Sequence, residues 1–192
     1  MKKKKLDHPY VSRGGVKLEH ALKEFQLDVT GKTVIDIGAS TGGFTDCLLQ
    51  RGAAKVYAVD VAYGILAWKL RKDPRVVVVE RTNARNLKLE VPGLTFCTID
   101  VSFIGLSKIL PAVYDLLAPG GEVVALIKPQ FEAKREEVGR GGIVRDEAVR
   151  MRVREKVKAE AIGVGYEVRG EIESPITGAE GNVEYFIRLV KP

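Results

Sequence analysis

The segment Thr33-Val-Ile-Asp-Ile-Gly-Ala-Ser-Thr-Gly-Gly-Phe44 carries the clearest local signal in this chain of 192 residues. A run rich in β-branched residues passes directly into a glycine-rich turn. Continuous apolar runs of this kind are typical of strands buried in parallel sheets, and glycine supplies the backbone freedom that a tight turn needs. The segment therefore predicts a buried strand over 33–37 that leads into a ligand-binding loop.

The spacing of the glycines excludes two common ligand classes. A dinucleotide fingerprint, G-x-G-x-x-G, needs its second glycine at the position of Ser40. A nucleoside-triphosphate P-loop needs Lys directly after its second glycine. Gly38 and Gly43 have the P-loop spacing, but Phe44 follows them. Neither phosphate-binding motif is complete.

Two carboxylates favour S-adenosylmethionine (SAM) as the cofactor. Asp36 precedes the glycine turn, and Asp60 ends the next predicted strand. SAM carries cationic sulfonium and ammonium groups and no pyrophosphate, so a nearby carboxylate would attract it, and Asp60 could accept both ribose hydroxyls. The alternative is that each Asp only caps a turn or ends a strand. The residues expected to bind the cofactor are Asp36, Gly38, Ser40, Thr41, Gly42, Gly43, Phe44 and Asp60.

Length and composition predict one domain in a reducing compartment. The chain is 45% hydrophobic, which is enough for one buried core. No apolar run is long enough to span a membrane, and no apolar stretch follows the lysines of residues 2–5, so we expect no secretory signal and a cytoplasmic location. Residues 1–12 are expected to form a basic tail or linker, and residues 13–192 one domain.

Cysteine and histidine usage argues against a metal site. Only two residues of each type occur, with no C-x-x-C motif. A zinc site of ordinary ligand composition is therefore not expected. Cys47 and Cys97 are expected to be buried as small apolar side chains. The pattern does not determine an oligomeric state, and a monomer is favoured.

The net charge of +6 favours an anionic partner, because clustered Lys and Arg gain free energy when they release counterions from phosphates. Arginines concentrate around Gly139-Arg-Gly-Gly142 and the helix that follows. A charge run is usually only a solvated face, but this one lies beside the predicted site. The residues expected to contact nucleic acid are Arg13, Arg135, Arg140 and Arg145.

The order of elements predicts an α/β fold. Helices are expected over 16–26, 43–50, 65–71, 105–117 and 146–163, and strands over 33–37, 55–59, 75–80, 94–100, 122–128, 166–173 and 183–189. Residues 129–145 are expected to form a long loop. The last two strands are separated by too few residues for a parallel crossover, so they must pair antiparallel. This is the architecture of Rossmann-like class I SAM-dependent methyltransferases, a mostly parallel seven-stranded sheet with one antiparallel strand near the C-terminus.

Four charged residues are expected to meet at one edge of this sheet. Ligands of open α/β sheets bind outside the carboxyl ends of the strands. Asp100 and Lys128 end two adjacent predicted strands, and Glu184 begins the reversed one. Lys17 comes from the helix that precedes the sheet.

Several motifs follow one another in a family-specific order. They are Ser12-Arg-Gly-Gly-Val-Lys17-Leu, Asp36-Ile-Gly-Ala-Ser-Thr-Gly-Gly-Phe44-Thr, Thr82-Asn-Ala-Arg85, Asp100-Val-Ser-Phe103, Leu126-Ile-Lys-Pro-Gln-Phe-Glu132 and Gly181-Asn-Val-Glu184. Together they resemble the methyltransferase domain of the TlyA (haemolysin A-like) family, which is related to the FtsJ-type ribose methyltransferases. The resemblance covers essentially the whole chain. TlyA-like proteins usually carry an N-terminal S4-type RNA-binding domain, which this chain is expected to lack.

The resemblance implies SAM-dependent 2′-O-methylation of ribosomal RNA, with ribosomal RNA or ribosomal subunits as the partner. It assigns a catalytic tetrad to Lys17, Asp100, Lys128 and Glu184, and cofactor contacts to Asn83 and Asp100. A ribose hydroxyl is a poor nucleophile, so Lys128 is expected to orient it or accept its proton, with Lys17 as a second cation that favours loss of that proton. The two carboxylates would hold the reacting groups in line.

Other reactions and functions fit the sequence less well. Base-amino methylation usually accompanies an (Asp/Asn)-Pro-Pro-aromatic motif, which Asp100-Val-Ser-Phe103 lacks. C5 methylation needs a nucleophilic cysteine at an exposed strand end, whereas Cys97 lies within its strand. A membrane-active haemolysin would need an insertable segment, and the amphipathic stretches 16–26 and 146–163 are short or heavily charged. A catalytically silent RNA-binding module is the other alternative.

Overall fold

The computed structural model describes residues 8–91 and 93–192, and the lysines of residues 2–5 lie outside this part. A seven-stranded sheet runs through the molecule in the order β3-β2-β1-β4-β5-β7-β6. The strands are β1 Thr33–Ile37, β2 Lys55–Val59, β3 Val76–Val79, β4 Phe96–Ile99, β5 Glu122–Ile127, β6 Glu167–Glu173 and β7 Tyr185–Val190. The helices are α1 Gly14–Glu24, α2 Gly43–Gln50, α3 Trp68–Arg71, α4 Leu110–Leu116, α5 Pro129–Glu132 and α6 Glu147–Val164, with 3-10 turns η1 Ala84–Asn86, η2 Leu106–Lys108 and η3 Arg135–Glu137.

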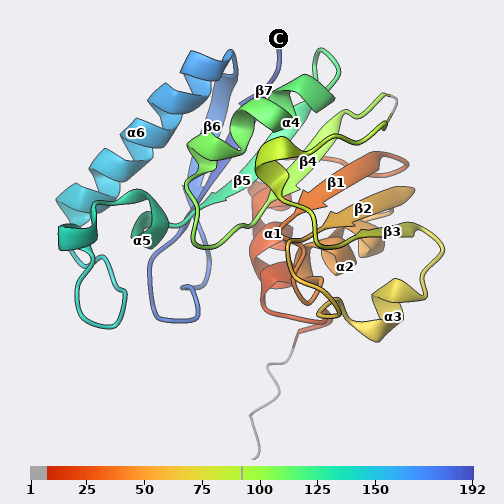
Figure 1. Cartoon of the computed structure of the whole chain (residues 1–192), viewed down its shortest axis with the longest axis horizontal. Coiled ribbons are helices and arrows are strands. Elements are labelled where there is room, and N and C mark those ends of the chain that lie inside the picture. Colours follow the sequence, from red (N-terminus) through yellow and green to blue (C-terminus); the bar gives the residue numbers. More distant parts are fainter. Residues whose placement is uncertain (1–7, 92) are drawn as a thin grey trace, which may run out of the picture.

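Helices cover both faces of the sheet (Figure 1). Strands β1 to β5 pair in parallel, whereas β7 is antiparallel to both of its neighbours. Side chains of β1 alternate between the faces, so Val34 packs in the core with α1 and α2 while Ile35 packs in the core with α4 and α6. Helix α6 contributes Val149, Val153 and Val157, which share one face at a spacing of four. The predicted fold is confirmed.

The predicted elements around the glycine turn agree closely with the structure. The bounds of β1, α2 and β2 are those expected. Gly52 has φ +84° just after α2, the left-handed conformation of a helix C-terminal glycine. Asp146 caps α6 by accepting a hydrogen bond from Ala148 N at 2.8 Å.

Several expectations differ from the structure. The helix expected over 105–117 is divided into η2 and α4, and α1 begins two residues earlier than expected. Helix α3 begins only at Trp68, because Ala67 is extended, with ψ 138°. The apolar run of β3 is half-buried at the edge of the sheet, although continuous apolar runs are typical of strands buried in parallel sheets. The expected loop 129–145 contains α5, η3 and an isolated bridge between Gly139 and Ile143.

A buried carboxylate joins β1 to its neighbours. Asp36 is fully buried, and its two oxygens accept hydrogen bonds from Thr45 Oγ1 at 2.6 Å and Thr98 Oγ1 at 2.9 Å. The bonds connect β1 to α2 on one side and to β4 on the other. Burial raises the pKa of Asp36 to about 6. Asp36 therefore holds the strand end that carries the glycine loop.

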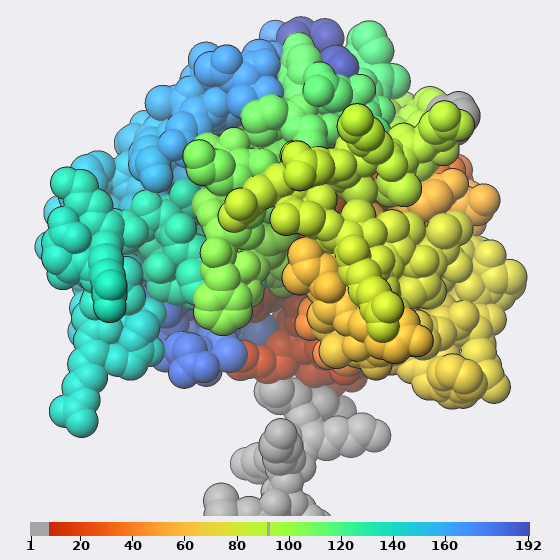
Figure 2. All heavy atoms as spheres, viewed as in Figure 1, coloured from red at the N-terminus to blue at the C-terminus, as the bar shows by residue number. Residues whose placement is uncertain are grey.

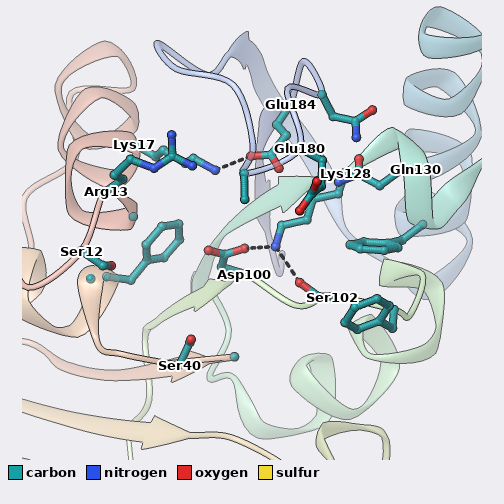
Figure 3. Close-up of a pocket in the computed structure, with 18 of the residues that line it drawn as sticks. Ser12, Arg13, Lys17, Ser40, Asp100, Ser102, Lys128, Gln130, Glu180 and Glu184 are labelled. Atoms are coloured by element: carbon teal, nitrogen blue, oxygen red, sulfur yellow. Dashed lines mark hydrogen bonds and ion pairs between the residues drawn. The ribbon is translucent and has the colours of Figure 1, made fainter. Parts of the chain in front are cut away.

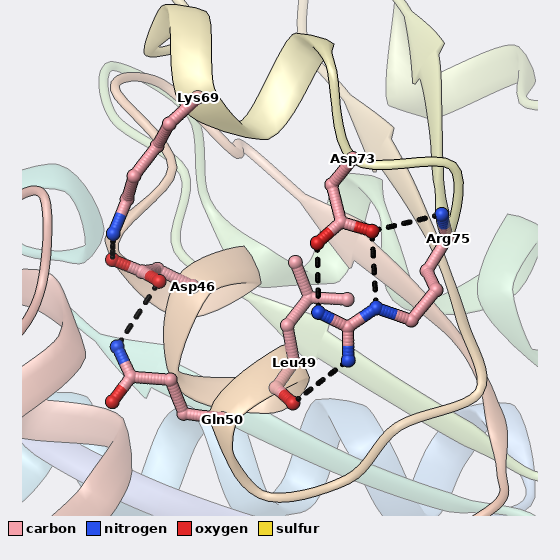
Figure 4. A network of polar contacts seen from close by, with 6 residues as sticks. All are labelled: Asp46, Leu49, Gln50, Lys69, Asp73 and Arg75. Atoms are coloured by element: carbon pink, nitrogen blue, oxygen red, sulfur yellow. Dashed lines mark hydrogen bonds and ion pairs between the residues drawn. The ribbon is translucent and has the colours of Figure 1, made fainter.

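A second carboxylate, Asp46, connects the segment before α1 to the body of the fold. Asp46 accepts a hydrogen bond from Val11 N at 2.8 Å and one from Gln50 Nε2 at 3.1 Å. Lys69 of α3 lies 2.8 Å from one of its oxygens in an ion pair (Figure 4). The chain ahead of Lys17 is therefore attached to both α2 and α3.

We predict that Asp36→Asn stabilises the protein more at pH 8 than at pH 4. The folded-state pKa of about 6 lies above the ordinary 3.8, so the folded protein binds the proton more tightly and wild-type stability falls as pH rises through this window. From pH 4 to pH 8, the free energy of unfolding of Asp36→Asn relative to that of wild type should increase by an amount approaching about 3 kcal/mol, because each pKa unit corresponds to about 1.4 kcal/mol. Denaturant unfolding at a series of pH values measures it.

Asp28→Asn provides a control of opposite sign. Asp28 is exposed, and hydrogen bonds from Thr30 lower its pKa. Its contribution to stability is present above the ordinary pKa and lost as pH falls, so its replacement should cost stability at neutral pH. A pH-independent difference between wild type and Asp36→Asn would contradict the assignment of Asp36.

Candidate active site

A cleft opens at the carboxyl edge of the parallel strands, where Figure 2 shows a hollow between the red N-terminal part and the green segment after β4. It consists of two pockets of about 620 Å³ and about 380 Å³. The first lies between α1, the glycine loop and the segment before β7, and the second between the ends of β2 and β4 and η1. Both pockets are lined by Gly38, Ser40, Asp100, Ser102 and Phe103.

The four predicted tetrad residues line the first pocket (Figure 3). Asp100 directly follows β4 and Lys128 directly follows β5. The antiparallel pairing of Tyr185 with Ile127 brings Glu184, one residue before β7, to the same edge. Lys17 reaches the pocket from α1. The structure therefore brings together residues that are far apart in the sequence.

The tetrad is organised as two ion pairs. Lys17 Nζ lies 2.5 Å from Glu184 Oε2, with both side chains nearly buried. Lys128 Nζ lies 2.6 Å from Asp100 Oδ1 and donates a hydrogen bond to Ser102 Oγ at 3.1 Å. The two carboxylates are expected from the sequence to hold the reacting groups in line, and each carboxylate does contact one lysine. Glu184 balances the charge of Lys17, so the effect of Lys17 on proton loss stays a prediction.

The glycine loop approaches β4 more closely than a side chain would permit. Gly38 has φ +80°, and a Cβ at this position would lie 2.3 Å from the carbonyl oxygen of Asp100. Ser40 also adopts a left-handed conformation, with φ +51°, and it lines both pockets. Thr41, Gly43 and Phe44 line the first pocket as expected for this loop.

Two predicted cofactor residues do not line either pocket. Asp36 is enclosed between β1, α2 and β4, so its carboxylate faces the core and stabilises the end of β1 that leads into the glycine loop. Gly42 faces away, because a Cβ there would lie 2.2 Å from Leu70 of α3. Its φ of +102° allows the loop to turn against that helix. Both residues support the loop in the structure, and their direct contact with a cofactor stays a prediction.

Asp60 and Asn83 line the second pocket. The Asp60 carboxylate accepts hydrogen bonds from Ser40 N and Ala62 N, each at 2.8 Å. Each oxygen keeps further acceptor capacity. Asn83 accepts a hydrogen bond from Arg85 N and caps η1. Asp60 thus joins the glycine loop to the loop after β2 while facing the pocket.

The residue types of the cleft fit SAM. The second pocket combines a partly exposed carboxylate, Asp60, with apolar walls that include Ile65 and Ile104, which suit an adenosine. The first pocket is lined by charges of both signs, with Asp100 and Glu184 paired to lysines. The two pockets meet at Gly38, where the backbone leaves room for a ligand that extends across both.

An exposed aromatic ring at the cleft was not identified from the sequence. Phe103 is 89% exposed, has a left-handed φ of +65°, and lies 5.0 Å from the ring of Phe131 between centroids. Left-handed backbone is unusual for a bulky residue and often marks a functional segment. The only sequence signal was an aromatic residue shortly after a strand-end acid.

Glu132 was also missed. It is buried, accepts a hydrogen bond from Leu106 N at 2.6 Å, and has a pKa raised by burial. Glu132 thereby fastens the segment after Phe103 to α5, which follows Lys128. Nothing in the local sequence distinguishes this glutamate from a surface residue.

Of the four predicted nucleic-acid contacts, Arg13 lines the first pocket, whereas Arg135, Arg140 and Arg145 are exposed on the segment after α5. Val138 and Gly142 of that segment line the same pocket. Within residues 8–91 and 93–192, the three exposed arginines form no ion pair, whereas the nearby Arg152 and Arg154 pair with Glu137 and Glu171. The unpaired positive charge is therefore confined to part of the basic run.

The cysteines lie outside the cleft. Both are buried and unpaired. Burial raises the pKa of the Cys47 thiol to about 12 and that of Cys97 well above its ordinary value. Neither thiol is suited to nucleophilic attack on a base. In the described part of the chain no three His, Cys, Asp or Glu side chains group as metal ligands, and no helix has the length and apolar character needed to cross a membrane.

The sheet order and the glycine loop are those of the class I SAM-dependent methyltransferase fold, which recurs with a TM-score of 0.68 at 19% identity in a Listeria monocytogenes structure described as a provisional methyltransferase of this class. Residues 10–191 match the model of the FtsJ-like methyltransferase family. The chain belongs to this family, whose methyl donor is SAM.

Similar proteins include named RNA methyltransferases. The chain is 55% identical to Bacillus subtilis YqxC, named as a provisional rRNA methyltransferase, over 95% of this chain and 66% of that protein. It is 48% identical to the Mycobacterium tuberculosis 16S/23S rRNA (cytidine-2′-O)-methyltransferase TlyA, over 95% of this chain and 69% of TlyA. A crystal structure from Lactococcus lactis, described as a provisional hemolysin, superposes with a TM-score of 0.93 at 55% identity, covering 98% of this chain and 90% of the other. The chain thus spans about two thirds of the two named relatives, YqxC and TlyA.

We predict that Asp60→Ala weakens SAM binding in isothermal calorimetry. Removing each charge-assisted hydrogen bond should cost about 1.5–3 kcal/mol. Because Asp60 also holds Ser40 N, the same variant should be tested with S-adenosylhomocysteine and its 2′,3′-dideoxy analogue. If Asp60 contacts the ribose hydroxyls, the substitution should weaken binding of the dideoxy analogue less than it weakens binding of S-adenosylhomocysteine. Equal penalties, or unchanged affinity for SAM, would contradict the assignment.

Proposed function

We propose that this protein transfers a methyl group from SAM to a ribose 2′-hydroxyl of ribosomal RNA. The observation that carries the proposal is the Lys128–Asp100 ion pair at the adjoining ends of β5 and β4, beside the glycine loop. The names of YqxC and TlyA support ribosomal RNA as the substrate class. The buried thiols disfavour C5 methylation of a base.

In this mechanism Lys128 acts on the hydroxyl that receives the methyl group. Bound SAM supplies an electrophilic methyl group on a sulfonium centre. Asp100 and Ser102 fix the Lys128 amine within the cleft, at 2.6 Å and 3.1 Å. From there the amine can hold the hydroxyl oxygen in line and accept its proton when neutral. Lys17 and Glu184 form the opposite wall and would position the ribose.

The exposed ring of Phe103 suits the base attached to that ribose. Single-stranded RNA is often bound through bases that stack on aromatic side chains. Phe103 borders both pockets and lies against Phe131, so its ring is available at the point where the target nucleotide would enter. An unstacked nucleotide is therefore the expected substrate form.

We predict that Lys128→Ala slows methyl transfer by about 10²–10⁴-fold, the usual contribution of a general base, while SAM affinity stays near wild type. Lys128→Arg should not restore the rate, because a guanidinium stays protonated. The assay follows labelled methyl transfer to isolated ribosomal subunits and to naked ribosomal RNA. Resistance of the product to alkaline cleavage then maps the 2′-O-methyl group.

Lys108→Ala is the matched control, because Lys108 is an exposed lysine in η2 that lines neither pocket. It should transfer methyl groups at the wild-type rate. Wild-type turnover by Lys128→Ala, on a substrate that the parent protein methylates, would exclude the tetrad mechanism and make Asp100 the next candidate.

We predict that replacing Arg140 and Arg145 together with Ala weakens RNA binding and reduces its salt dependence. The slope of log affinity against log salt should fall by about 0.7–0.9 for each phosphate that the variant no longer neutralises. Arg152→Ala should change the slope less, because Glu137 already neutralises that arginine. An unchanged slope in the double variant would assign Arg140 and Arg145 to an ordinary solvated face.

A further inference from the structure

Two large aromatic rings are exposed on the segment that runs from the loop after β2, which borders the second pocket, into α3. Tyr63 is 67% and Trp68 is 68% exposed. The guanidinium carbon of Arg81 lies 4.3 Å from the centroid of the Tyr63 ring, and Lys72 Nζ lies 4.9 Å from that of Trp68. We call these four residues the aromatic–cation surface. Tyr and Trp are enriched at molecular interfaces, where the ring packs against the partner and the polar edge stays hydrated.

Among the residues that the structure describes, the cations of this surface differ from their neighbours in having no acidic partner. Lys69 pairs with Asp46 and Arg75 with Asp73 (Figure 4), and Arg71 pairs with Glu80. Within the described ranges, Lys72 and Arg81 form no ion pair and lie over aromatic rings instead. The positive charges of Lys72 and Arg81 are therefore available to an anion. The charges of the neighbouring Lys69, Arg71 and Arg75 are neutralised by their acidic partners.

The surface is held in place by a clamp of hydrogen bonds. Glu80 Oε1 accepts a hydrogen bond from Gly64 N at 2.9 Å as well as from Arg71. Arg71 Nε in turn donates to Leu66 O at 3.1 Å. The loop that carries Tyr63 is thus tied to α3, which carries Trp68. Ordering the rings in the free protein reduces the entropy cost of binding.

The rings are not part of the cofactor pocket. Val61 and Ile65, from the same loop, line the second pocket, but Tyr63 and Trp68 do not. Figure 2 shows the teal segment that carries Arg140 on one side of the hollow and the yellow region of α3 on the other. A nucleic-acid strand that crosses the cleft would therefore meet arginines without ion pairs on one flank and aromatic–cation pairs on the other.

We propose that the aromatic–cation surface is a second RNA-contact site that binds unpaired nucleotides flanking the methylated residue. Tyr63 and Trp68 stack on bases, and Lys72 and Arg81 contact the adjoining phosphates. Every base has a face that can stack on a ring, so this site provides affinity and orientation without reading the sequence. The inference rests on the proposed function for the identity of the substrate.

The test measures RNA binding separately from methyl transfer. The full chain is titrated with a short fluorescent single-stranded oligoribonucleotide and with the matched duplex. Tyr63→Ala and Trp68→Ala should each weaken single-strand binding about five- to a hundredfold, the range for the removal of one stacked base, and weaken duplex binding less. SAM affinity should not change. On ribosomal substrates the KM for RNA should rise while kcat stays near wild type.

Lys72 and Lys55 offer a matched pair of variants. Both are lysines over an aromatic ring, but Lys55 lies at the amino end of β2, away from the cleft. Lys72→Ala should lower the salt slope of single-strand binding by about 0.7, and Lys55→Ala should leave it unchanged.

The outcomes separate this inference from the proposed function. Wild-type RNA affinity in both ring variants, or no binding of the oligoribonucleotide by the wild-type chain, overturns the second site and does not affect the assignment of methyl transfer. RNA binding that depends on Tyr63 and Trp68 without any methyl transfer would retain the second site and refute the reaction. Unchanged RNA binding, with self-association abolished in Trp68→Ala by sedimentation, would overturn the RNA site and assign the surface to a second copy of the chain.

Discussion

The close approach of Gly38 to Asp100 determines where ligands can lie. A side chain at position 38 would lie 2.3 Å from the Asp100 carbonyl, and Asp100 N donates to Ile37 O at 2.8 Å. The ends of β1 and β4 therefore remain together beyond the sheet. Because of this approach, the glycine loop and the loop of Asp100 form one continuous wall, and both pockets share it. Asp36 secures the same wall from within the core, through Thr45 and Thr98.

The two ion pairs of the tetrad have different physical roles. Glu184 is 2% exposed, and a Cβ at Gly178 would lie 2.4 Å from its carboxylate. Burying such a pair costs desolvation energy, and removal of one partner leaves an uncompensated charge. Lys17 and Glu184 are thus suited to hold a wall in position. Lys128 and Asp100 are more open to the cleft, so a substrate hydroxyl can reach them.

Sequence patterns predicted the parts of the site that depend on local structure. The glycine turn followed from spacing around Gly38, and the convergence of Asp100 and Lys128 followed from strand ends in a parallel sheet. The pairing within the tetrad did not follow, because Lys17 and Glu184 are separated by 167 positions and meet only through the packing of α1 beside β7. Glu132 was missed for the same reason. Asp36 was assigned to the cofactor because its sequence position does not reveal which face of β1 it occupies.

Paired and unpaired charges lie in different parts of this molecule, which the net charge of +6 does not reveal. Inside the cleft, Asp100 and Glu184 are paired with lysines, whereas Asp60 faces the second pocket and suits a cationic cofactor. On the flanks, within the described ranges, Arg140 on one side and Lys72 on the other form no ion pair. A polyanionic strand would be attracted to the flanks and repelled by the interior, unless the carboxylates there are paired. Lys17 and Lys128 provide that pairing, so the lysines of the tetrad neutralise the part of the cleft that one ribose would enter.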